Sequence, residues 1–137
     1  LSIKTMKINR QYLYRALFGL YILAVCILCF IKPDSIPSKG FDWFGLPADK
    51  VGHFLMFLPF PILSFTAFVK DYGTGTDAFF RLMVIVLAGA AIAIGTELIQ
   101  KVLGYRSFDL HDFFCDIAGI LAGTVVATLF IAIKKRK

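Results

Sequence analysis

Long apolar runs recur along almost the whole chain, and short segments with charged residues, prolines and glycines separate them. A helix of about 20 apolar residues crosses the roughly 30 Å core of a bilayer, and a somewhat shorter run suffices when flanking side chains snorkel. Four runs meet this length. The sequence therefore predicts four membrane spans, over about residues 14–31, 51–69, 82–99 and 113–133.

The composition indicates that the membrane domain makes up most of the chain. Hydrophobic residues are 58% of the 137, which is more than a soluble fold of this size can bury. These residues recur along the chain and do not form a single anchor. We expect an all-α fold, an integral membrane four-helix bundle, in three parts: a basic N-terminal segment (1–13), the membrane domain (14–133) and a basic tail (134–137).

The distribution of basic residues predicts the orientation. The N-terminal segment and the first apolar run resemble a signal peptide, but no small-residue cleavage site follows Ile31, so we interpret the run as an uncleaved span. Ten of the 15 Lys and Arg residues lie at the termini or in the loop after the second span, and five lie in the other two loops. Because cytoplasmic loops are enriched in Lys and Arg, both termini are predicted to be cytoplasmic.

Neither the net charge nor the cysteines indicate another class of protein. The charge is +6, but the basic residues sit beside apolar runs and form no basic face studded with aromatics, so we predict no nucleic-acid binding. Cys26 and Cys29 lie inside an apolar run and Cys115 stands beside another. We interpret all three as small hydrophobic residues, without a disulfide framework.

Ionisable and amide side chains from three parts of the sequence are predicted to meet at the extracytoplasmic end of the bundle. The second span begins there with Lys50 and His53, and the third ends there with Glu97 and Gln100. The fourth begins there with aspartates spaced three and four residues apart. An ionisable cluster in a membrane is by default a functional hypothesis. We therefore predict a ligand-binding site made of Lys50, His53, Glu97, Gln100, Arg106, Asp109, Asp112 and Asp116.

Two of these carboxylates are expected to lie about one turn inside apolar helices. An ionised carboxylate at such a depth costs about 2.5–3.5 kcal/mol, so Glu97 and Asp116 should face the interior of the bundle and have partners. The alternative is that the cluster only fastens the helices together, through bonds that contribute about 1 kcal/mol each. The number of polar groups at this end exceeds what fastening requires.

Prolines and glycines predict how the spans pack. Pro59 and Pro61 are expected to distort the middle of the second span. Gly119 and Gly123 form a GxxxG pair, which we expect to pack the third and fourth spans closely. The alternative is that the same pair forms the contact between two chains of a homodimer. The proline- and aromatic-rich segment 32–49 is interpreted as a loop on the outer interface, either an anchor or a lid.

Three motifs follow one another in a specific order. They are DKVGHF with Lys50 and His53, TELIQ with Glu97 and Gln100, and RSFDLHDFFCDIAGILAG, which begins at Arg106. Together they resemble the VanZ-like family of small bacterial membrane proteins, over about residues 49–123. The sequence has an aspartate at position 116, where the family usually has asparagine, and this adds a negative charge.

The resemblance implies a multi-pass protein of the bacterial inner (cytoplasmic) membrane with a role in the cell envelope. The family is named for a member that lowers susceptibility to teicoplanin, a glycopeptide antibiotic that carries a fatty acyl chain. The partners that it suggests are membrane lipids and a lipid-linked cell-wall precursor or lipoglycopeptide. Antibiotic resistance is a property of that member and is not implied for every relative.

Three functions remain open at this point. The first is recognition or modification of a lipid-linked or glycopeptide-type molecule at the outer polar site. The second is an intramembrane enzyme acting on a lipid headgroup, with His53, Glu97 and Asp112 as catalytic candidates. The third, a channel, would need a homo-oligomer, because the cytoplasmic half has no comparable polar groups. His53, Glu97, Asp112 and Asp116 have donor types that suit a divalent metal, but their spacing matches no strong motif, so we assign no metal and no cofactor.

Overall fold

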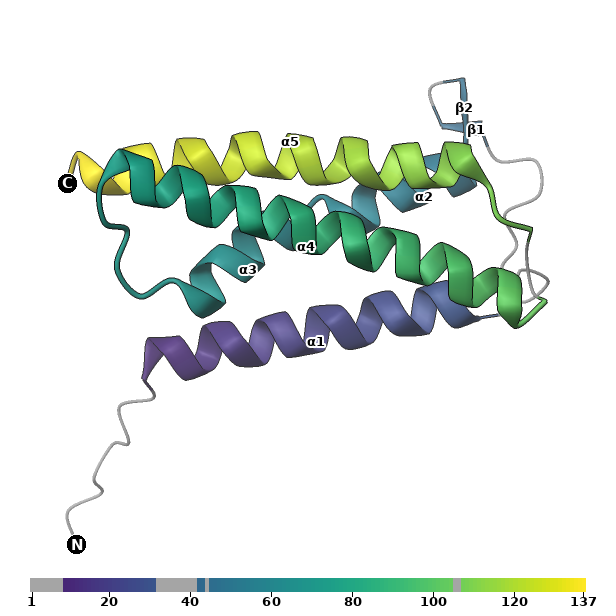
Figure 1. Ribbon diagram of the computed structural model, residues 1–137, viewed down its shortest axis with the longest axis horizontal. Helices are drawn as coiled ribbons and strands as arrows, with labels where there is room; N and C mark the ends of the chain where they lie inside the picture. Colours follow the sequence, from purple (N-terminus) through teal and green to yellow (C-terminus); the bar gives the residue numbers. More distant parts are fainter. Residues whose placement is uncertain (1–8, 32–41, 44, 105–106) are drawn as a thin grey trace, which may run out of the picture.

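The computed structural model describes residues 9–31, 42–43, 45–104 and 107–137. Five helices account for most of these residues: α1 (Arg10–Phe30), α2 (Ala48–Phe57), α3 (Phe60–Phe68), α4 (Gly75–Val102) and α5 (Leu110–Lys135). Four helical segments are long and apolar enough to cross a membrane, with α2 and α3 together forming the second. Figure 1 shows them side by side, with the start of α1 and the end of α5 at one end of the molecule. The predicted four-helix membrane bundle is confirmed.

The helices extend beyond the apolar runs because polar residues cap them. α4 begins at Gly75, where Thr74 and Asp77 form a capping box: Thr74 Oγ1 accepts the Asp77 N–H at 3.3 Å, and Asp77 Oδ2 accepts the Thr74 N–H at 3.1 Å. α5 begins after Asp109, whose Oδ1 accepts the His111 N–H at 2.8 Å. Side-chain capping thus adds helical turns that an apolar run does not reveal.

The second span breaks where the two prolines predicted it. α2 ends at Phe57, and α3 begins at Phe60. A proline ring has no N–H to donate and clashes with the preceding turn, so the helix cannot continue unchanged through Pro59 and Pro61. The break lets α2 pack against α5 while α3 passes towards α1 (Figure 1). The break therefore determines the direction of α2, the helix that carries Lys50 and His53.

The glycine pair of α5 contacts a different helix from the one expected. A Cβ atom at Gly119 would overlap the backbone carbonyl oxygen of Phe54, and one at Gly123 would overlap that of Leu58. Both glycines therefore pack against the second span, and the prediction that this pair contacts the third span is wrong. The third and fourth spans do pack against each other, with Gly89 of α4 facing Ile120 of α5. The homodimer seam on this pair is also wrong, because the second span already covers both residues.

Polar bonds attach α1 to the last turn of α3. Gln11 Nε2 donates to the carbonyl oxygens of Thr66, at 3.3 Å, and Ala67, and Arg15 Nε donates to that of Ala67 at 3.3 Å. The last carbonyls of a helix have no partner within it, so α1 supplies the donors that α3 lacks. Further along, the Tyr21 hydroxyl donates to the Met56 carbonyl oxygen at 2.6 Å. These bonds hold the otherwise weakly buried first helix on the bundle.

The segment before α2 contains a minimal hairpin. β1 (Asp42–Trp43) pairs antiparallel with β2 (Leu46–Pro47), and Gly45 between them has a φ of 77°, which glycine adopts readily. The expected interfacial loop covers 32–49, and its residues 32–41 and 44 lie outside the described residues. Its role as an anchor or lid stays a prediction.

Candidate functional site

The polar cluster lies at the end of the bundle opposite both termini. It is formed near the start of α2, the end of α4 and the start of α5, which Figure 1 shows at the same end of the molecule. The side chains that the structure brings together are Lys50, His53, Glu97, Asp109, Asp112 and Asp116. Of the other predicted members, Gln100 takes a different partner, described below, and Arg106 lies outside the described residues.

The outer part of the cluster, which we call the rim, consists of Asp49, Lys50 and Asp109. Lys50 Nζ donates to Asp109 Oδ2 at 2.7 Å, lies 3.9 Å from Asp49 Oδ2, and also donates to Asp112 Oδ1. The Lys50 and Asp109 side chains are 21% and 38% exposed. The hydrogen bond from Lys50 and that from the His111 N–H lower the pKa of Asp109 to about 2. The rim therefore joins α2 to α5 through charged, solvated bonds.

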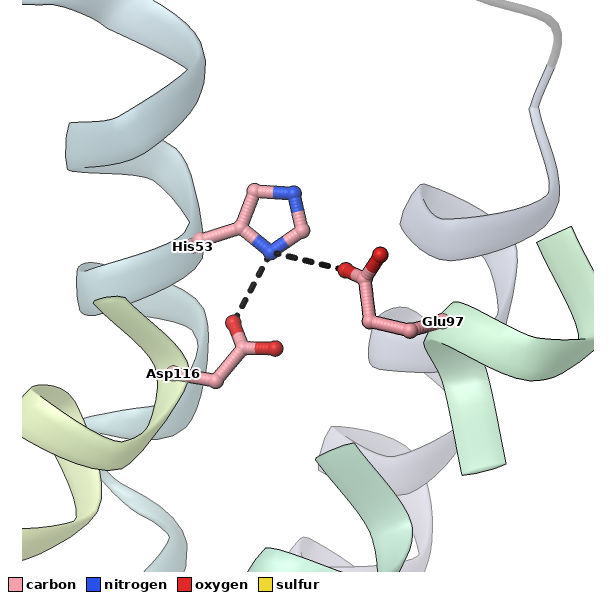
Figure 2. Close-up of side chains that lie close together, drawn as sticks. All are labelled: His53, Glu97 and Asp116. Atoms are coloured by element: carbon pink, nitrogen blue, oxygen red, sulfur yellow. Dashed lines mark hydrogen bonds and ion pairs between the residues drawn. The ribbon is translucent and has the colours of Figure 1, made fainter. Parts of the chain in front are cut away.

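The inner part, which we call the inner triad, consists of His53, Glu97 and Asp116. Figure 2 shows the two carboxylates, which come from α4 and α5, both facing the same ring nitrogen of His53. His53 Nδ1 lies 2.8 Å from Asp116 Oδ1 and 4.0 Å from Glu97 Oε1. The three residues are 7%, 1% and 0% exposed. Three separate helices thus present titratable groups to one buried point.

Asp112 connects the rim to the inner triad. Its Oδ1 accepts from Lys50, while its Oδ2 lies 3.6 Å from His53 Nε2, and the residue is 2% exposed. The histidine therefore has a carboxylate facing each of its ring nitrogens: Asp116 at Nδ1 and Asp112 at Nε2. Such flanking fixes the orientation of the ring.

The inner triad does not satisfy its own hydrogen-bonding groups. Glu97 Oε1 and Asp116 Oδ2 are buried and have no hydrogen-bond partner among the residues that the structure describes. A buried polar atom without a partner costs free energy, about 1–3 kcal/mol and more when charged. In the described part of the cluster, the carboxyl groups of five residues face Lys50, His53 and, at Asp109 alone, the exposed His111. Among the described residues, the inner triad is therefore short of donors and positive charge.

Gln100 and α1 make a contact that the sequence did not indicate. Gln100 Nε2 donates to the backbone carbonyl oxygen of Cys29 at 2.6 Å, and both residues are buried. The amide that was expected to bind a ligand thus bonds the end of α1. Sequence reasoning missed the part played by Cys29 because a backbone carbonyl carries no sequence signal. His111, in the first turn of α5, is exposed, with 84% of its side chain accessible.

The side chains of the cluster are suited to three kinds of chemistry: metal binding, proton transfer and hydrogen bonding to a ligand. One imidazole nitrogen and two carboxylate oxygens of the inner triad lie within 4.8 Å of one another, a combination that suits a divalent metal. A histidine held between carboxylates can also accept a proton. Carboxylate oxygens without donors can accept hydrogen bonds from a ligand.

Comparison with known proteins adds one finding. A family model described as VanZ/LLP1 matches residues 18–131, which is most of the chain and includes every helix that contributes to the cluster. Neither the curated proteins nor the solved structures contain a significant match.

Proposed function

The chain belongs to the VanZ/LLP1 family, and we propose that the cluster at the extracytoplasmic end of its bundle recognises the polar headgroup of a lipid-linked or glycopeptide-type molecule. The protein is a multi-pass membrane protein, and the proposal places it in the bacterial inner membrane. The Lys- and Arg-rich termini support this orientation, since they favour the cytoplasm and leave the cluster on the outer side.

The observation that carries the proposal is the unsatisfied inner triad. Glu97 Oε1 and Asp116 Oδ2 are buried without a hydrogen-bond partner in the described part of the chain. A cluster that only fastens helices gains nothing from unpaired carboxylate oxygens, because each lowers the stability of the folded state. A ligand that supplies donors removes this cost, so the unpaired oxygens favour binding over fastening.

The surplus of carboxylates indicates which headgroups suit the site. Hydroxyl, amide N–H and ammonium groups donate to carboxylates, whereas a phosphate alone would be repelled by them. Lipid-linked cell-wall precursors and lipoglycopeptides such as teicoplanin combine such donors with an apolar chain. The headgroup would contact the partly exposed rim first, and the apolar chain would lie along the lipid-facing helices.

Modification of the same molecule is the second candidate function. It is favoured by His53, which has Asp116 at 2.8 Å from Nδ1 and Asp112 at 3.6 Å from Nε2. This arrangement is suited to general-base catalysis of an attack on a headgroup. Recognition without chemistry needs only the hydrogen-bond acceptors and is therefore the simpler proposal.

Native mass spectrometry of the gently extracted protein tests the proposal. Wild type should retain a specific additional mass that Glu97→Gln and Asp112→Asn both lose, because each variant removes a carboxylate of the cluster. Asp71→Asn is the matched control: Asp71 lies near the other end of the bundle, where its Oδ1 accepts the Gly73 N–H at 3.1 Å, and asparagine keeps that acceptor.

Two results would count against headgroup recognition. One is a wild-type protein that retains nothing specific while both variants melt at a lower temperature, which would make the cluster a structural fastening. The other is a retained mass that survives both substitutions. A retained mass that changes on incubation with wild type but not with His53→Asn would favour the enzymatic candidate.

A further inference from the structure

The inner triad has the distances of a metal site before any ion is considered. His53 Nδ1 lies 2.8 Å from Asp116 Oδ1 and 4.0 Å from Glu97 Oε1, and the three donor atoms lie within 4.8 Å of one another. Nitrogen and oxygen ligands bind Zn²⁺ at about 2.0–2.2 Å, so two ligands of one ion lie no more than about 4.4 Å apart. The separations of 2.8 and 4.0 Å lie within this limit.

Two unpaired atoms point independently to a missing positive partner. Glu97 Oε1 and Asp116 Oδ2 have no hydrogen-bond partner among the described residues, and their side chains are 2% and 0% exposed. Figure 2 shows the Glu97 carboxylate directed at His53, with one oxygen joined to Nδ1 as an ion pair. An ion bound between these side chains would give the carboxylates the positive charge that they lack.

The surroundings of His53 match those of a metal-binding histidine. Such a histidine usually directs its second ring nitrogen at a carboxylate, which fixes the tautomer and raises the basicity of the ligand nitrogen. Here Nε2 lies 3.6 Å from Asp112 Oδ2, and the other Asp112 oxygen accepts from Lys50. Asp112 and Lys50 would thus position the histidine without touching the ion.

Charge balance selects a divalent ion. Two ionised carboxylates and a neutral imidazole carry a total charge of −2, which a dication neutralises among apolar helices, where net charge is costly. An imidazole ligand favours Zn²⁺ or Mn²⁺ over Ca²⁺, which prefers oxygen ligands only.

We propose that His53 Nδ1, Glu97 and Asp116 bind one divalent transition-metal ion of the Mn²⁺ to Zn²⁺ series, oriented by Asp112. The inference goes beyond headgroup recognition and does not depend on it, because the ion would satisfy the inner triad whether or not a headgroup contacts the rim.

Metal titration of the purified full chain in lipid nanodiscs provides the test. After removal of bound metal with a chelator and of the chelator by gel filtration, Zn²⁺ or Mn²⁺ is added and bound metal is measured by mass spectrometry. Wild type should bind one ion per chain. Glu97→Gln and Asp116→Asn should weaken binding at least tenfold, and Asp112→Asn should weaken it by about 10–100-fold without removing the ligands.

Two controls separate this site from adventitious binding. Asp71→Asn and His111→Asn each remove a donor of the same type from an exposed position and should bind as wild type does. X-ray absorption of Zn-loaded wild type needs no variant and should show one imidazole with oxygen ligands. The proposal is overturned if wild type binds neither metal, if Glu97→Gln binds as wild type does, or if the spectrum shows zinc bound by cysteine sulfur.

The metal site and headgroup recognition can fail separately. Wild type that binds one ion but retains no specific lipid-linked mass would support the metal site and contradict the headgroup proposal. The opposite result is wild type that retains such a mass at equal occupancy before and after removal of metal, and binds neither ion. That result would support the headgroup proposal and contradict the metal site.

Discussion

The rim and the inner triad each combine two carboxylates with one basic side chain, at the same end of the bundle, yet they differ in how their charges are balanced. In the rim, Lys50 contacts Asp49 and Asp109 at 3.9 and 2.7 Å, and the Lys50 and Asp109 side chains are partly exposed. In the inner triad, two buried carboxylates share one histidine, and each has an oxygen without a hydrogen-bond partner among the described residues. Fastening helices explains the rim, whereas the unpaired oxygens of the inner triad are the observation from which we propose a bound ligand.

The largest loss in the free energy of unfolding is expected from Lys50→Met, which removes the positive charge of the rim. Methionine keeps the unbranched stem but removes the ammonium that bonds Asp112, a side chain that is 2% exposed. Removing one partner of a buried pair costs about 3–5 kcal/mol, and the partial exposure of Lys50 places the loss near about 3 kcal/mol. Reversible unfolding in mixed micelles measures it.

Lys101→Met provides the control for this substitution, because Lys101 is exposed at the same end of the bundle. It should leave the free energy of unfolding unchanged. Equal losses in the two variants would mean that the rim does not fasten α2 to α5.

A somewhat smaller loss is expected from Gly119→Ala, which disturbs the helix contact under both parts of the cluster. The added Cβ would overlap the Phe54 carbonyl oxygen, so α2 must move away from α5. Overpacking of this kind costs about 1–3 kcal/mol. Gly95→Ala, whose Cβ would meet nothing within 4 Å, should cost nothing. Unfolding in mixed micelles compares the two, and equal stability would contradict the close contact of α5 with α2.

A still smaller effect is the pH dependence of the rim. The pKa of Asp109 is lowered to about 2, chiefly by its hydrogen bond from Lys50, from an unfolded-state value of 3.8. Its contribution to stability is therefore complete above about pH 4 and is lost as the pH falls from about 4 towards 2. Because Asp109 is 38% exposed, screening limits this to about 1 kcal/mol or less.

Thermal melts of wild type and Asp109→Asn between pH 6 and pH 2 measure this contribution. The difference in melting temperature between the two proteins should be constant down to about pH 4 and then shrink. A difference that is unchanged at pH 2 would show that the carboxylate of Asp109 does not stabilise the rim.

The smallest change in stability is expected from Glu97→Gln, measured without added metal. The substitution removes a buried charge whose Oε1 has no hydrogen-bond partner in the described chain, so the free energy of unfolding should stay within about 0.5 kcal/mol of wild type or rise. Unfolding in mixed micelles is again the measurement. A loss of 2 kcal/mol or more would assign the inner triad the same fastening role as the rim.

The sequence predicted the bundle because the signal for a membrane span is strong: the apolar runs fix the number of spans, and Pro59 and Pro61 fix the break in the second. It did not predict that α4 begins at Gly75, because the capping box of Thr74 and Asp77 lies in a polar segment before the apolar run. The partner of Gly119 was wrong because a small residue indicates a close approach and does not name the helix that approaches.

Within the candidate site, helix periodicity and the alternation of spans predicted that His53, Glu97 and Asp116 would meet. They could not predict which groups pair with one another, since the rim and the inner triad both combine carboxylates with one basic side chain. Gln100 was assigned to the ligand, but its amide bonds the Cys29 carbonyl oxygen. Such a contact depends on how α1 packs against α4, and the apolar surface of α1 encodes it only weakly.

The most direct test of the difference between the two parts of the cluster is native mass spectrometry of wild type and Glu97→Gln, prepared side by side and matched in folded fraction. We predict that wild type carries a specific bound ligand, lipid-linked or metallic, and that Glu97→Gln loses it while remaining folded. Wild-type protein that carries no ligand, with a Glu97→Gln variant that is markedly less stable, would contradict the account and make the inner triad a structural contact like the rim.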